Sequence, residues 1–70
     1  MLKYYIKTLG KSVPISSREY ENYIIEDAIC DGQTKTIAMR VIRENRQEAR
    51  ETGENIFTLT FGAQVIVSKE

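Results

Sequence analysis

The chain has 70 residues, with ten basic and ten acidic side chains, one cysteine and no histidine. Because this length supports only one small core and the formal net charge is zero, we expect a single domain over residues 1–70 with no global attraction to nucleic acid or an anionic membrane. The missing histidine removes the commonest metal ligand and general base, and a lone cysteine excludes an internal disulfide, so we expect a protein that is not an enzyme and holds no metal or cofactor.

The first fifteen or so residues predict a β-hairpin. Residues 2–9 are rich in tyrosine and isoleucine, Gly10-Lys11 is a turn signal, and residues 12–15 return alongside. Tyr4 and Tyr5 are adjacent, so a strand would direct their side chains to opposite faces. One of the two rings should therefore be exposed if the other is buried.

A helix is predicted from residue 17 to about residue 30. Ser16 and Glu19 have the spacing of a capping box, in which each side chain binds the backbone amide of the other residue. An apolar face follows at helical spacing, and Gly32 suits the left-handed position just past the helix end. The residues of that face are Tyr20, Ile24 and Ala28.

Two interpretations compete for residues 33–53. Residues 34–42 are rich in β-formers and residues 44–51 in charge and helix formers, so the composition favours a strand over 34–42 followed by a charged arm. The alternative is a second helix over 37–52. Its apolar stripe would be Ala38, Ile42, Asn45 and Ala49.

The last part of the chain, residues 55–68, contains no charged residue and alternates apolar with mostly polar side chains. This pattern favours one long strand, bent at Gly62. The alternative is a turn at Gly62-Ala63, which would fold the run into a hairpin with Leu59 opposite Ile66. An uncharged strand of this length needs protection, so we expect it to be central in the sheet or to be covered in a homodimer.

These elements together predict an α+β fold. A small antiparallel or mixed sheet would be made by the N-terminal hairpin, the strand over 34–42 and the long strand over 55–68, with the helix over 17–30 packed across it.

Candidate binding residues fall into three groups, and each suits recognition of a macromolecule better than catalysis. Arginines are concentrated between residues 40 and 50 and acidic residues on the predicted helix, while one candidate tyrosine lies on the predicted first strand and one on the helix. The candidates are Arg40, Arg43, Arg46 and Arg50; Glu21, Glu26 and Asp27; and Tyr5 and Tyr23.

Residues 5–16 (YIKTLGKSVPIS), followed by Arg18-Glu19-Tyr20, resemble the start of small phage and prophage proteins of Gram-positive bacteria. The resemblance covers about the first third of the chain and carries over no site. Among short phage proteins, inhibitors of host proteins, including those of bacterial defence systems, recur as a class.

We therefore expect a non-catalytic protein–protein interaction module, of the kind a phage uses to inhibit or assist a host protein. The alternative is a nucleic-acid-binding accessory or regulatory protein that uses the arm from Arg40 to Arg50. No apolar stretch is long enough to cross a bilayer and residues 1–5 lack the apolar core of a signal peptide, so we expect a cytoplasmic location in the host cell.

Overall fold

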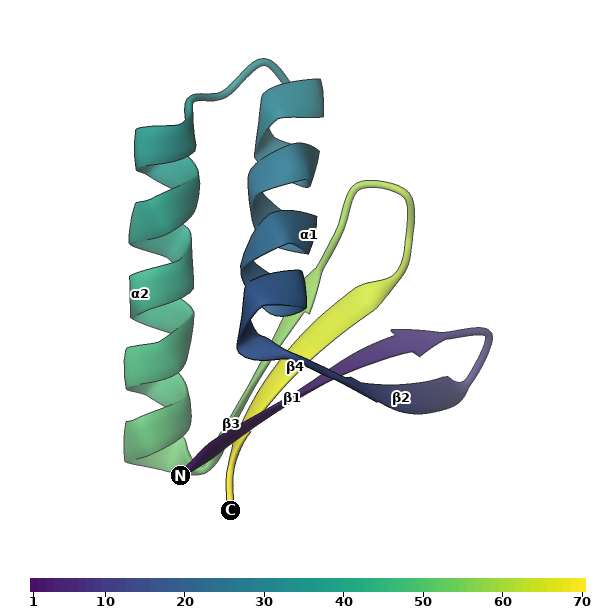
Figure 1. Cartoon of the computed structure of the whole chain (residues 1–70), viewed down its shortest axis with the longest axis vertical. Helices are drawn as coiled ribbons and strands as arrows, with labels where there is room; N and C mark the ends of the chain where they lie inside the picture. Colours follow the sequence, from purple (N-terminus) through teal and green to yellow (C-terminus); the bar gives the residue numbers. More distant parts are fainter.

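A computed structural model describes all 70 residues as two helices packed on one face of a four-stranded antiparallel sheet (Figure 1). The sheet has the order β2-β1-β4-β3, so the first and last strands of the chain are the two central ones. The predicted α+β class is confirmed. In chain order the elements are β1 (Leu2–Thr8), β2 (Lys11–Ile15), α1 (Ser17–Cys30), α2 (Lys35–Thr52), β3 (Glu54–Thr58) and β4 (Gln64–Lys69).

The N-terminal hairpin of β1 and β2 is confirmed, with its turn one residue earlier than predicted. Thr8 lies opposite Lys11, so the turn residues are Leu9 and Gly10. Both have positive φ, 50° and 80°, as a type I′ turn requires. This turn matches the right-handed twist of the strands, and it holds Leu9 in a conformation that a side chain of its kind rarely adopts.

Helix α1 begins as its sequence predicts. The Ser16 hydroxyl accepts a hydrogen bond from the Glu19 amide at 3.0 Å, and the Glu19 carboxylate accepts one from the Ser16 amide at 2.8 Å. The predicted apolar face is buried, and Gly32 has the expected left-handed conformation at φ 81°.

Removing both halves of this capping box is expected to destabilise the protein. Ser16→Ala combined with Glu19→Ala leaves two backbone amides of the first turn without partners, which costs about 1–2 kcal/mol. A urea titration followed by circular dichroism measures the change. Arg18→Ala, at an exposed position of the same turn, is the matched control and should stay within about 0.5 kcal/mol of the parent protein.

The predicted strand over 34–42 and the charged arm are wrong, because residues 35–52 form one continuous helix, α2. Thr34 caps its start by accepting a hydrogen bond from the Ile37 amide at 3.2 Å, and Gly53 ends it at φ 103°. Burial of the apolar stripe outweighs the weak β-propensity of the segment. The buried residues are those of the alternative interpretation: Ala38, Ile42, Asn45 and Ala49.

The predicted single strand over 55–68 is also wrong, because the run folds into a hairpin of β3 and β4. The Leu59 amide donates to the Ala63 carbonyl and the Gly62 amide to the Leu59 carbonyl, so the turn has three residues and Gly62 at φ 101° closes it. Leu59 therefore lies beside Ala63, not opposite Ile66. One half of the uncharged run, β4, is central, and the other half, β3, is an edge.

The core lies between the helices and the sheet. Val65 and Val67 of β4 are fully buried against Ile24 of α1 and Ile42 of α2. Tyr20 is also fully buried, and its hydroxyl accepts a hydrogen bond from the Asn45 side chain at 3.2 Å. This bond satisfies a polar group inside the core and joins the two helices.

Candidate functional site

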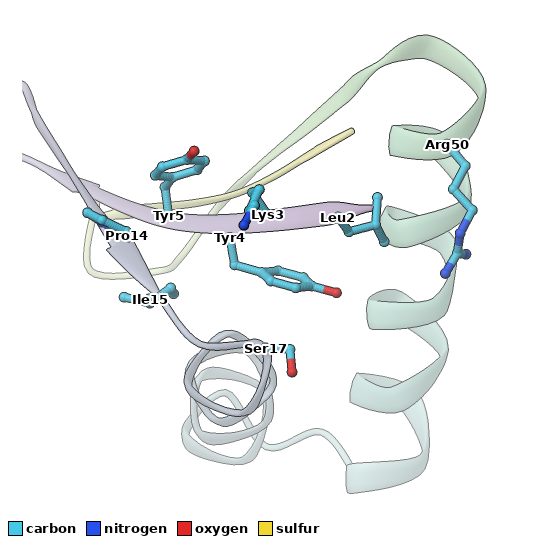
Figure 2. Close-up of a pocket in the computed structure, with 8 residues that line it drawn as sticks. All are labelled: Leu2, Lys3, Tyr4, Tyr5, Pro14, Ile15, Ser17 and Arg50. Carbon is cyan, nitrogen blue, oxygen red and sulfur yellow. The ribbon is translucent and has the colours of Figure 1, made fainter. Parts of the chain in front are cut away.

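The helices cover one face of the sheet and leave the other open. Figure 2 shows Tyr4 on the same side of β1 as both helices and Tyr5 on the opposite side, as the sequence predicts for adjacent strand residues. Tyr4 packs against the core, while no element covers the face that carries Tyr5.

An apolar row crosses this open face over all four strands. Tyr5 of β1 lies opposite Pro14 of β2 on one side and opposite Ile66 of β4 on the other. Ile66 in turn lies opposite Ile56 of β3. We call Pro14, Tyr5, Ile66 and Ile56 the apolar row. Ile56 remains 51% exposed, because it stands at the sheet edge with a neighbour on only one side.

Polar side chains border the apolar row on both sides. Because side chains alternate along a strand, the residues two positions away share the open face. An apolar centre with a polar border is the usual anatomy of a protein–protein interface. The border residues are Lys3, Ser68 and Glu54 on one side and Ser12, Lys7, Gln64 and Thr58 on the other.

Tyr5 is the one candidate binding residue from the sequence analysis that belongs to the apolar row, and it contacts the last residue of the chain. Its hydroxyl donates a hydrogen bond to the Glu70 carboxylate at 2.8 Å. This bond raises the pKa of Tyr5, because the carboxylate favours the protonated phenol. The bond directs the Tyr5 hydroxyl toward the residue that follows β4.

A hollow of about 630 Å³ adjoins the β2 end of the row (Figure 2). It lies where β2 gives way to α1, so that the start of β1 has a neighbouring strand on its β4 side only. Leu2, Pro14 and Ile15 line it with apolar groups, Lys3, Arg50 and Ser17 line it with charged and polar groups, and Tyr4 and Tyr5 complete the lining. The hollow therefore places apolar surface and two cations beside the apolar row.

Arg46 points into the protein. Its guanidinium donates to Glu21 of α1 at 2.7 Å and to the Tyr4 hydroxyl at 3.0 Å, and it lies 5.5 Å from the centre of the Tyr4 ring. Burial opposes its charge, but the hydrogen bonds to Glu21 and Tyr4 outweigh that effect and raise the pKa of Arg46. Arg46 and Glu21, which form the single ion pair of the protein, therefore join the two helices to β1.

Two more candidates on α1 also make contacts within the protein. The Asp27 carboxylate accepts hydrogen bonds from the Thr60 amide at 3.1 Å and the Thr60 hydroxyl at 2.6 Å, which ties the β3–β4 turn to the helix. Tyr23 is half-buried and packs against the core. Both side chains are thus partly occupied in holding the fold.

The remaining candidates are exposed on the helices, away from the open face. Glu26 is exposed on α1. Arg43 and Arg50 are exposed on α2, where they border a hollow of about 240 Å³ together with Met39, and Arg40 is exposed nearby on the same helix. The arginines thus do not project on an arm but belong to a packed helix.

The sequence prediction missed three of the four residues of the apolar row. The prediction of one long strand over 55–68 puts Ile66 on its mostly polar face, where a single isoleucine does not indicate a binding surface. The signal that would have revealed it is Gly62, because a three-residue turn at this glycine brings Ile56 opposite Ile66. Pro14 gives no sign in the sequence that it lies opposite Tyr5, because that pairing depends on the register of the hairpin.

A smaller apolar pair lies at the hairpin tips. Leu9 of the first turn is fully exposed and Phe61 of the second is 68% exposed, and both border one shallow hollow. The two turns project past the helices on the same side of the molecule (Figure 1). This pair sits on turns, whereas the apolar row sits on paired strands and is held more rigidly.

The chain has no cluster of three or more histidine, cysteine or acidic side chains arranged to hold a metal ion. Neither helix combines the length and the apolar character needed to span a bilayer. In comparisons with known proteins, no family model matches this chain, and no curated protein or solved structure gives a match.

Proposed function

We propose that this protein is a non-catalytic protein–protein interaction module that binds its partner through the open face of the sheet. The observation that supports the proposal is the apolar row, which four strands hold in register on a face that no helix covers. Soluble domains that expose an apolar stripe with a polar border generally use it for binding. A flat face of this kind suits a protein surface better than a small molecule, which needs a deep pocket.

The resemblance of the first third of the chain to small phage proteins suggests the kind of partner. On this proposal the partner is a protein of a bacterial host, and the module inhibits or assists it by occupying one of its surfaces. The fold supplies a rigid platform for such a role, because the row stands on paired strands backed by the buried core.

The proposal is tested by capturing proteins from a bacterial lysate with the parent protein and two variants. Ile66→Lys places a charge at the centre of the row and is expected to abolish capture of the partner, a loss of at least about a hundredfold in affinity. Gln64→Lys adds the same charge on the same strand and face but outside the row, and it should retain the partner. Both variants must first show the thermal unfolding midpoint of the parent protein within a few degrees.

The same capture separates the second candidate function, nucleic-acid binding. The observation that favours this candidate is that Arg43 and Arg50 are exposed on one flank of α2. Binding through phosphates weakens steeply between 50 and 200 mM salt and is lost on nuclease treatment. We expect capture to survive nuclease treatment and to weaken with salt far less steeply than phosphate binding does, and a partner lost on nuclease treatment would favour the arginine flank instead.

A further inference from the structure

The strand β3 leaves one whole edge of the sheet unpaired. The Leu59 amide donates to the Ala63 carbonyl, and the Lys69 amide donates to the Gly53 carbonyl. The odd-numbered residues of β3 therefore direct their backbone groups toward β4. Ile56 and Thr58 must then direct their amides and carbonyls away from the sheet. The Glu54 carbonyl also points outward, where it accepts a hydrogen bond from the Thr52 hydroxyl at 3.0 Å.

The opposite edge of the sheet is blocked. The bond from the Glu70 amide to the Met1 carbonyl shows that the odd-numbered residues of β1 direct their backbone groups toward β4, so the even-numbered residues direct theirs toward β2. Their partners Val13 and Ile15 therefore direct their backbone groups toward β1, and the even-numbered residues of β2 direct theirs away from the sheet. One of the outward residues is Pro14, which has no amide hydrogen to offer. The sheet thus has a protected edge at β2 and an open one at β3, which contains neither proline nor lysine.

An acidic flank of α2 runs along the open edge. Glu48 accepts a hydrogen bond from the Asn55 side chain of β3, and Glu44 and Glu51 stand four and three residues away on the same side of the helix. We call these three glutamates of α2, Glu44, Glu48 and Glu51, the acidic flank. All three are exposed, and none of them belongs to an ion pair within the protein.

From this arrangement we infer that β3 accepts a strand from a basic segment of the partner protein, as a fifth strand of the sheet. This inference rests on the proposed function and names the chemistry of the partner. The side chain opposite Ile56 would lie on the open face and extend the apolar row by one residue. The side chains opposite Asn55 and Phe57 would point to the helix side, where the acidic flank favours lysine or arginine.

Charge also decides between such a partner and a second copy of this chain. A two-fold pairing of β3 with itself, centred on Ile56, would bring two acidic flanks against each other. Like charges placed together in this way oppose association, whereas a basic strand neutralises them. A second copy of this chain, which the sequence analysis gives as one of two ways to protect residues 55–68, is therefore the less favourable partner for this edge.

A short synthetic peptide tests the inference directly. The probe is a blocked peptide that alternates valine or isoleucine with lysine over seven residues, and the control is a peptide of the same composition with its lysines grouped at one end. Addition of the alternating peptide is expected to slow hydrogen exchange of the Ile56 and Thr58 amides at least about tenfold, because these amides gain hydrogen-bond partners. Unchanged exchange at both amides under saturating peptide would overturn the inference.

Variants separate the backbone edge from the acidic flank. Thr58→Pro removes one outward amide without altering the apolar row, and it should weaken binding of the alternating peptide about tenfold. The matched control is Ser12→Pro, which removes an outward amide at the opposite edge and should leave binding unchanged. Glu44→Gln with Glu51→Gln should weaken binding by a similar factor and flatten its salt dependence.

The outcomes also distinguish this inference from the proposed function. If Ile66→Lys abolishes capture of the partner but the Ile56 and Thr58 amides exchange freely in the captured complex, the proposed function stands and strand addition is wrong. If both amides become protected because the protein forms dimers at high concentration, the choice of a basic partner over a second copy is wrong.

Discussion

Replacement of Tyr20 by alanine is expected to unfold the protein. Tyr20 is fully buried, its ring centre lies 4.9 Å from that of Tyr4, and its hydroxyl joins α1 to α2 through Asn45. Removing a buried aromatic ring costs about 3–5 kcal/mol. A domain of this size has about that much net stability, so the variant should lose its helical circular dichroism at 25 °C.

The conservative variant Tyr20→Phe separates packing from hydrogen bonding. It keeps the ring but removes the oxygen that accepts from the Asn45 side chain, which is only 8% exposed. We expect a folded protein that is less stable by about 1–2 kcal/mol, as measured by urea titration. If Tyr20→Phe unfolds like Tyr20→Ala, the hydrogen bond rather than the ring dominates at this site.

Arg46→Gln is expected to cost more stability than any other single arginine replacement on α2. Glutamine cannot reach both Glu21 and the Tyr4 hydroxyl, and Glu21 is left partly buried without its ion-pair partner. A loss of about 1–3 kcal/mol follows from breaking this partly buried network. Thermal and urea unfolding of the variant measure it.

The matched control changes Arg43 and Arg50 together to glutamine. Both are exposed and neither belongs to an ion pair, so the unfolding free energy should change by less than about 0.5 kcal/mol. A large loss of stability in this control, with none in Arg46→Gln, would contradict the structural role assigned to Arg46.

The elements whose ends carry local signals could be predicted from the sequence. The capping box at Ser16 and Glu19 and the Gly10 turn depend on contacts within a few residues, and both proved correct apart from a one-residue shift of the turn. Thr34 and Gly53 are equivalent signals for the second helix, but the β-formers that follow Thr34 favour a strand on composition alone. Burial of Ile42 and Ala49 decides that segment, and burial depends on the rest of the fold.

The apolar row could not be predicted in the same way, because it depends on strand register. Tyr5 and Ile66 are neighbours only because β1 pairs with β4 across the whole length of the chain. Alternation along the last segment predicted strand structure correctly but does not show where the chain turns. Similarly, the charge of Arg46 was evident from the sequence, whereas its inward orientation follows from the packing of α1 against α2.

The most direct measurement of how this protein binds is site-specific photocrosslinking in the complex with its captured partner. A photoreactive phenylalanine analogue is placed at Tyr5, in the apolar row, and in a second protein at Arg43, on the flank of α2. We predict a crosslink to the partner from position 5 and none from position 43. Crosslinking from position 43 alone would contradict binding through the open face of the sheet.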